Sequence, residues 1–126
     1  NAYASKGISF IAINSNDTSR YPDDSPEDMA KMAKEYNFPF PYLFDETQEV
    51  AQAYDARCTP DFYVFDKELS LVYRGQFDDS RIGNNIVVTG NSIRDALDRI
   101  LDGLYVPKEQ KPSLGCSIKW KEETNI

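Results

Sequence analysis

Two cysteines are the residues best able to do chemistry in this chain of 126 residues. Cys58 lies two positions before Pro60, at the head of an apolar run, and Cys116 lies in the C-terminal segment. The chain contains no histidine, which removes the imidazole base of Ser-His and Cys-His catalysis and the usual zinc and haem-iron ligand. Two thiols are too few for a disulfide scaffold or a four-thiolate metal site. Chemistry therefore depends on thiols, carboxylates or residues outside this chain, and we expect no bound metal or cofactor.

The overall charge narrows the set of partners. The chain has a net charge of −7 and a pI near 4.5. Nucleic acids and anionic membranes attract basic surfaces, so neither is an expected partner. No stretch approaches the roughly 20 apolar residues of a membrane span, and no signal-peptide pattern is visible at the start. We therefore favour a cytoplasmic location, although a chain that begins without an initiator Met would not show an upstream leader.

The order of apolar runs and turn signals predicts an α/β fold. Segment 1–7 resembles the end of a helix capped by Gly7, and the nearly uninterrupted apolar run 8–14 suits a strand covered on both faces. Ser25 and Pro26 are typical of a helix start. The other predicted elements are a short apolar segment at 42–44, a helix at 47–54, an antiparallel hairpin at 62–66 and 69–74, a polar loop at 78–90 and an amphipathic helix at 93–104.

These elements together predict a mixed sheet that carries a C-terminal hairpin and is followed by a final helix. We expect one domain over residues 1–105. We expect residues 106–126 to form a C-terminal tail that packs on or over this domain, because the tail has two prolines and little periodicity.

Several motifs occur in an order that resembles a known family. The run FIAINSND is followed by YPDDSPEDM, by FPFPYLFDETQEVAQAYDARCTPDFYVFD and then by LVYRGQFDDSR. With Cys-Thr-Pro ahead of the hairpin and KPSLGCSIKWK near the end, the order is similar to bacterial thioredoxin-like proteins of the redoxin family. These are related to the alkyl hydroperoxide reductase/thiol-specific antioxidant group and are often labelled thiol-disulfide isomerases. The similarity extends from Gly7 to Lys121.

This resemblance implies that the chain lacks the first β-α unit of a thioredoxin-like fold. Family members place a central strand, and the helix that carries a Cys-x-x-Cys motif, ahead of the segment that matches residues 1–7. That strand would lie between the strands predicted at 8–14 and 62–66, which do not pair directly in the family's arrangement.

The resemblance also assigns roles around Pro60. The matching proline in thioredoxin-like folds is cis and packs beside the redox centre, and the residue before it, here Thr59, offers backbone groups to an extended substrate. Thr59 and Pro60 are therefore the expected substrate-binding residues, with a plain trans turn proline as the alternative. Cys58 would be an auxiliary or resolving thiol, or else a small part-buried apolar residue. Arg57 would lower its pKa and apolar neighbours would raise it.

Two other features allow two interpretations each. Cys116 could act as a resolving thiol, because such cysteines often occupy mobile C-terminal segments, or it could help to pin the tail to the domain. The sequence leaves open whether Cys58 and Cys116 form a disulfide, because it gives no distance between their Cα atoms. The loop residues Asp78, Asp79 and Arg81 either line the substrate approach or form a solvated turn.

The resemblance implies that the full-length protein is a thiol-disulfide oxidoreductase or a peroxiredoxin-like antioxidant protein. Its substrates would be protein disulfides or peroxides, its reductant would be an external dithiol donor, and a homodimer is compatible with this class. We expect the redox cysteine pair upstream of this chain, so the chain alone should be inactive. The alternatives are a non-catalytic thioredoxin-like peptide-binding module and a thiol-based metal-handling redoxin.

Overall fold

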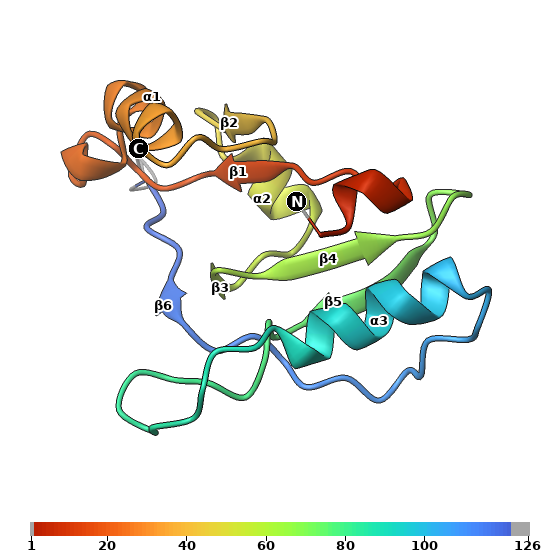
Figure 1. Cartoon of the computed structure of the whole chain (residues 1–126). Coiled ribbons are helices and arrows are strands. Elements are labelled where there is room, and N and C mark those ends of the chain that lie inside the picture. The colour runs from red at the N-terminus through yellow and green to blue at the C-terminus, as the bar shows by residue number, and fades with distance from the viewer. Residues whose placement is uncertain (1, 122–126) are drawn as a thin grey trace. The chain divides into compact units, whose positions relative to one another are not determined.

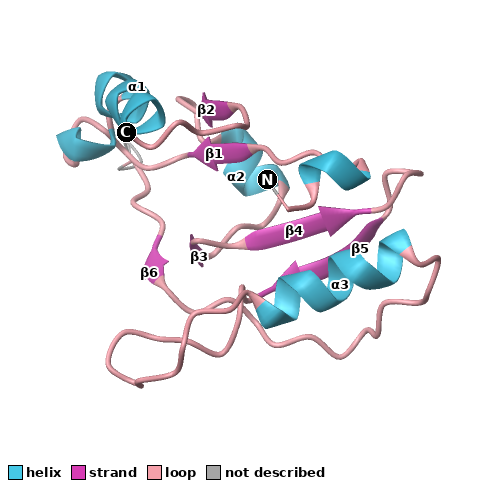
Figure 2. Ribbon diagram, viewed as in Figure 1, coloured by secondary structure: helices cyan, strands magenta, loops and turns pink. Residues whose placement is uncertain are grey.

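The computed structural model describes residues 2–121 and has a mixed α/β composition (Figures 1 and 2). Its elements group into two compact units. Unit 1 contains the residues up to Ala56 and those from Ile118 onward, and unit 2 spans Arg57–Ser117. No helix within residues 2–121 is long and apolar enough to cross a membrane.

Unit 1 is built on a short parallel ladder. β1 (Ala12–Asn14) pairs with β2 (Tyr42–Phe44). The unit also contains η1 (Ala4–Lys6), η2 (Pro22–Asp24), α1 (Pro26–Glu35) and α2 (Glu49–Ala53). Helix α1 begins where the sequence indicates a start, because Ser25 Oγ accepts a hydrogen bond from the Asp28 N–H at 3.3 Å and Pro26 occupies the first turn.

The apolar run 8–14 forms a shorter strand than the sequence predicts. Only Ala12–Asn14 has a strand partner, because β2 offers three residues for pairing. Ile11 and Ile13 expose 62% and 43% of their surface. The prediction that both faces of this run are covered is therefore wrong for the described residues.

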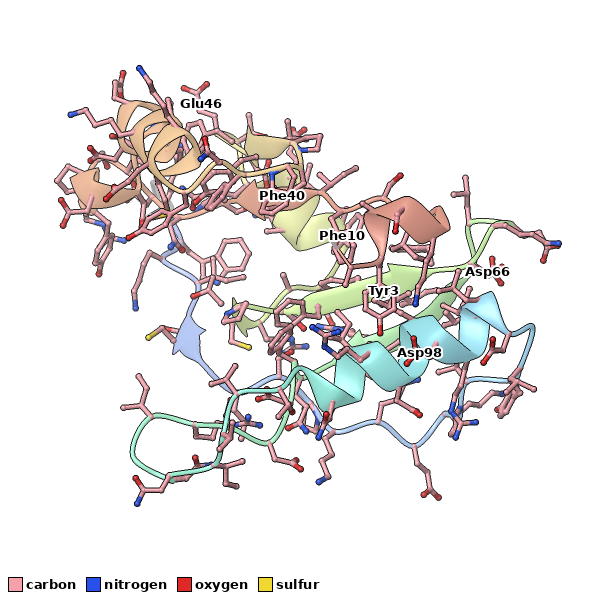
Figure 3. The ribbon with its side chains drawn as sticks, viewed as in Figure 1. Tyr3, Phe10, Phe40, Glu46, Asp66 and Asp98 are labelled. Atoms are coloured by element: carbon pink, nitrogen blue, oxygen red, sulfur yellow. The ribbon has the colours of Figure 1, made fainter. Side chains whose placement is uncertain are left out.

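Unit 2 contains an antiparallel hairpin covered by a helix (Figure 2). β4 (Phe62–Phe65) pairs with β5 (Leu71–Gly75), with a register shift at Val64/Phe65. In the turn between them, Asp66 accepts hydrogen bonds from the backbone N–H groups of Glu68 and Ser70 (Figure 3). Helix α3 (Asn91–Leu101) contacts both strands. The buried apolar residues of these three elements are Val64, Tyr73, Ile93, Ala96 and Leu97.

The strands form three separate ladders, where the sequence predicts a single mixed sheet. The third ladder pairs β3 (Cys58–Thr59) with β6 (Cys116–Ser117) in antiparallel orientation. Within residues 2–121 no strand joins β1–β2 to β4–β5, so each ladder ends after two strands. Residues 106–117 belong to unit 2 and those from Ile118 onward to unit 1, and the expected division into a domain and a tail at residue 105 stays a prediction.

Candidate functional site

The segment around Pro60 forms a short ladder with the C-terminal segment (Figure 1). The Thr59–Pro60 peptide bond is cis. Thr59 lies opposite Cys116, and Cys58 lies opposite Ser117. The hydroxyl of Thr59 donates a hydrogen bond to the Cys116 carbonyl at 3.3 Å. The structure thus brings together the four residues that the sequence singled out.

The two thiols of this ladder are free and point to opposite faces. Side chains alternate along a strand, and directly opposed residues share a face. Cys58 therefore shares a face with Ser117, whereas Cys116 shares the other face with Thr59. Cys58 is half-buried and Cys116 is exposed. This arrangement does not turn the two sulfur atoms toward each other, as a disulfide requires.

The environment of Cys58 disfavours its thiolate. Burial raises the pKa of the Cys58 thiol above its ordinary value of 9.0, the Asp61 carboxylate raises it further, and the Arg74 guanidinium lowers it in part. The sequence predicts that Arg57 lowers this pKa, but the cation that acts on the thiol is Arg74. A thiol with a raised pKa is protonated at neutral pH and is a weak nucleophile.

Asp61 links the Pro60 segment to the hairpin and to the C-terminal segment. Its carboxylate accepts hydrogen bonds from the Tyr63 hydroxyl at 3.1 Å and from Arg74 Nη2 at 3.3 Å. Tyr63 and Arg74 are opposed across β4–β5, which brings Arg74 to this carboxylate. The Ser113 hydroxyl donates to the other carboxylate oxygen at 3.0 Å. The sequence analysis missed Asp61, because only strand pairing reveals its partners.

A cavity of about 290 Å³ opens beside Pro60 within unit 2. This volume is at the small end for ligand-binding pockets. The cavity is lined by the apolar residues Pro60, Phe62, Phe77 and Leu114 and by the polar residues Gln76, Asp78, Ser80, Arg81 and Ser113. The rings of Phe62 and Phe77 pack at 5.3 Å between centroids. The cavity therefore offers both apolar and polar groups to a ligand.

The loop that follows β5 is organised around a buried carboxylate. Asp78 accepts hydrogen bonds from the Ser80 hydroxyl and from the backbone N–H groups of Ser80, Thr89 and Gly90. The Ser80 hydroxyl and the Gly90 N–H hold the pKa of Asp78 well below its ordinary value. The four hydrogen bonds that Asp78 accepts hold the loop and stabilise its charged form. Asp78 is therefore unsuited to proton transfer.

Arg81 is held by oxygen atoms of the same loop. Its Nη1 donates to the backbone carbonyls of Asp78 and Ser80 at 2.8 and 2.7 Å, and its Nη2 donates to Gln76 Oε1 at 2.6 Å. Asp79 is instead exposed and paired with Lys111 at 2.9 Å. Arg81 and Asp78 line the cavity, whereas Asp79 does not belong to its lining.

Among the described residues, no group of three or more His, Cys, Asp and Glu side chains could hold a metal ion.

Comparison with known proteins identifies the family. Residues 1–74 match the model of the AhpC/TSA family. The chain therefore belongs to the AhpC/TSA family, which is a family of redoxins. No curated protein matches the chain.

Two solved structures are similar to this chain over nearly its whole length. One is an uncharacterized conserved protein from Geobacillus kaustophilus, with a TM-score of 0.95 and 66% identity, covering 98% of this chain and 66% of that one. The other is a hypothetical protein from Sinorhizobium meliloti 1021, with a TM-score of 0.94 and 48% identity, covering 97% of this chain and 67% of that one. The chain thus spans about two thirds of the length of these relatives.

Proposed function

We propose that the full-length protein is a thiol-disulfide oxidoreductase or a peroxiredoxin-like antioxidant protein whose redox cysteine pair lies in residues that precede Asn1. Membership of the AhpC/TSA family is the observation that carries this proposal. The longer chains of the solved relatives support it, because they leave room for the strand and helix that carry such a pair.

The reaction is thiol chemistry with either substrate. A thiolate attacks one sulfur of a substrate disulfide and expels the other sulfur as a thiolate, and the second cysteine then attacks the mixed disulfide and releases the reduced substrate. With a hydroperoxide, the thiolate takes up the terminal oxygen and an alcohol leaves. The sulfenic acid then condenses with the second thiol and releases water. In both cases an external dithiol donor reduces the protein disulfide.

Thr59 and Pro60 hold the substrate in this proposal. Both residues are exposed, and the apolar residues that line the neighbouring cavity include Phe62 and Phe77. An extended polypeptide that pairs with a strand gains affinity from main-chain hydrogen bonds and specificity from a side-chain pocket. In this proposal the backbone at Thr59 supplies the main-chain hydrogen bonds, and the cavity supplies the side-chain pocket.

Cys116 and Cys58 are the auxiliary thiols of the proposal. Cys116 is exposed, which suits a resolving cysteine that must reach a sulfenic acid or a mixed disulfide. Cys58 is less suited to attack because burial and Asp61 raise its pKa. We therefore propose that Cys116 is an auxiliary resolving thiol that acts beside the second cysteine of the redox pair, and that Cys58 has an accessory role.

The test compares the full-length protein with the 126-residue chain. We expect the full-length protein to reduce insulin disulfides or to turn over a hydroperoxide with a dithiol donor, and the chain alone to react no faster than free thiol. Serine substitution of each cysteine that precedes Asn1 should abolish turnover, whereas Cys58→Ser should retain most of it. Turnover by the chain alone would contradict the proposal, as would full activity in the serine variants.

A non-catalytic peptide-binding module is the second candidate function. The raised pKa of Cys58 favours it, because a thiol with a raised pKa is a weak nucleophile. Such a module binds an extended polypeptide without turnover. A full-length protein that binds reduced, alkylated insulin B chain but reduces no disulfide would support the module over the enzyme.

A further inference from the structure

Residues 114–117, which we name the strap, fill the strand edge that the proposed function gives to substrate. The strap contains β6, whose ladder with β3 sets Cys116 opposite Thr59. One edge of a strand accepts one partner strand, so the strap and an extended substrate cannot both pair with the same edge of β3 at Thr59. We infer that the strap is a built-in competitor that a polypeptide must displace before it binds. This inference rests on the substrate role proposed for Thr59 and Pro60.

The chain is fixed just before the strap. The backbone carbonyl of Lys111 accepts a hydrogen bond from the Gln76 N–H at 3.0 Å, which ties the segment to the end of the hairpin. The Ser113 hydroxyl donates to the Asp61 carboxylate at 3.0 Å. These contacts do not involve strap residues, so they can persist when the strap leaves β3.

The chain is fixed again just after the strap, by contacts inside unit 1. Ile118 is buried. The Lys119 N–H donates to Asn16 Oδ1 at 2.9 Å, and the Lys119 carbonyl accepts from the Asp17 N–H at 2.7 Å. The contacts on each side of the strap do not involve strap residues, so displacement of the strap does not require either neighbouring segment to unfold.

The strap buries little surface. All four of its residues are exposed, and Leu114 exposes 64% of its surface. The contacts that hold it include the ladder with two residues of β3 and the hydrogen bond from Thr59 to the Cys116 carbonyl. Segments with little buried apolar area open at a small cost compared with global unfolding. Local opening of the strap is therefore accessible to the folded protein.

Gly115 gives control over the strap without altering β3. A Cβ atom at this position would lie 2.3 Å from the Thr59 carbonyl oxygen and 3.1 Å from its carbon. Both contacts are with backbone, so a side chain at position 115 must push the strap away. Gly83 offers a matched control in the same unit, because a Cβ there meets nothing within 4 Å. Its φ of +86° makes Gly83→Ala a mildly strained substitution that leaves the strap in place.

The first experiment measures binding of a free peptide by fluorescence anisotropy. The probe is a labelled PSLGSSIKWK peptide, which has the sequence of residues 112–121 with serine in place of the cysteine. The protein carries Cys58→Ser and Cys116→Ser, so no disulfide can form at the β3–β6 ladder. A strap that is closed nine times in ten lowers the apparent affinity about tenfold. We therefore expect Gly115→Ala to bind the probe about tenfold more tightly than the background protein, and Gly83→Ala to bind as the background does.

A control peptide tests where the probe binds. The peptide PSLASSIKWK has alanine where the probe has glycine, so its Cβ would meet the same Thr59 carbonyl. We expect it to bind the Gly115→Ala protein much more weakly than the probe does. Equal affinity of the probe for the background and Gly115→Ala proteins would overturn the inference, and so would equal affinity of the two peptides.

A second variant locks the strap on β3. It tests whether the strap competes with the peptide even if Gly115→Ala fails to fold. Thr59→Cys, in a Cys58→Ser background, sets a new thiol opposite Cys116. Opposed residues of an antiparallel ladder lie about 4.5–5.5 Å apart between Cα atoms, which suits a disulfide. We expect the oxidised form to bind no probe and dithiothreitol to restore binding. Unchanged binding in the oxidised form would overturn the inference.

Neither binding experiment depends on catalysis. A full-length protein that reduces no insulin and no hydroperoxide would count against the proposed enzyme, whereas the peptide measurements would still decide whether the strap competes for the β3 edge.

Discussion

Thr59 and Cys116 are 57 residues apart in the sequence and lie opposite each other in the β3–β6 ladder, where the Thr59 hydroxyl donates to the Cys116 carbonyl at 3.3 Å. The same Thr59 precedes the cis bond to Pro60, at the position that the family resemblance gives to substrate. The C-terminal segment therefore pairs with the residue to which we assign substrate binding in the proposed function.

Thr59→Val tests the side-chain part of this contact. Valine keeps the branched shape but removes the hydroxyl that donates to the Cys116 carbonyl. Because the contact is exposed, we expect the free energy of unfolding to fall by less than about 1 kcal/mol. Backbone amides of residues 114–117 should nevertheless exchange hydrogen faster, because the strap opens more often. Thr18→Val, in unit 1, is the matched control, and an unchanged exchange rate in Thr59→Val would contradict the prediction.

The elements with a local sequence signal were predictable. Ser25 and Pro26 mark the start of α1, and the helical spacing of Ile93, Ala96 and Leu97 marks the buried face of α3. The ladder of β3 and β6 was not predictable, because two residues on each side carry no periodicity. The burial expected for segment 8–14 depended on neighbours that no local pattern reveals.

Leu97→Ala tests the packing of α3 on the hairpin. Leu97 exposes only 3% of its surface, so its truncation leaves a cavity in unit 2. We expect the free energy of unfolding to fall by about 2–5 kcal/mol, measured by urea denaturation. Leu101→Ala lies on the same helix at a site that is 38% exposed, and its loss should be clearly smaller. Equal losses would show that α3 does not pack as described.

Asp78→Asn tests the carboxylate that organises the loop after β5. An amide in place of the carboxylate cannot accept all the hydrogen bonds from Ser80, Thr89 and Gly90. We expect a lower urea midpoint than for Asp79→Asn, because Asp79 forms an exposed ion pair. An equal effect of the two substitutions would contradict a structural role for Asp78.

The pH dependence gives Asp78 a second test. Folding lowers the pKa of Asp78 below its ordinary value of 3.8. Its contribution to stability is therefore present above pH 3.8 and is lost as the pH falls through the lower value of the folded state. We expect the stability difference between the unmodified protein and Asp78→Asn to shrink as urea denaturation is repeated at decreasing pH below 3.8. A stability difference that grows as the pH falls would contradict the prediction.

The sequence predicts which residues lie together at the candidate site, but it does not predict which charged groups shift the pKa of Cys58. Cysteine chemistry and the family resemblance pointed to Cys58, Thr59, Pro60 and Cys116, which the β3–β6 ladder brings together. Pairing across the hairpin brings the groups that act on the Cys58 thiol together, and this pairing cannot be read from the sequence of a single strand. Arg57 is next to Cys58 in the sequence, yet Arg74 is the cation that lowers its pKa.

The reactivity of Cys58 tests that electrostatic account. Because burial and Asp61 raise the pKa of this thiol, its alkylation by iodoacetamide at about pH 8 should be slower in the folded protein than in urea, where the thiol titrates near its ordinary value. A Cys116→Ser background leaves Cys58 as the single cysteine of this chain. Equal rates with and without urea would contradict the raised pKa.

Substitution of the two charged neighbours should move the Cys58 rate in opposite directions. Asp61→Asn removes the negative charge that raises the pKa, so alkylation should become about two- to tenfold faster. Arg74→Gln removes the positive charge that lowers the pKa, so alkylation should become slower. Ser113→Ala is the control, because it removes one hydrogen bond to Asp61 and leaves both charges in place. A rate that rises equally in all three variants would indicate loosened packing around Cys58, because a change in charge alone cannot speed the reaction in every case.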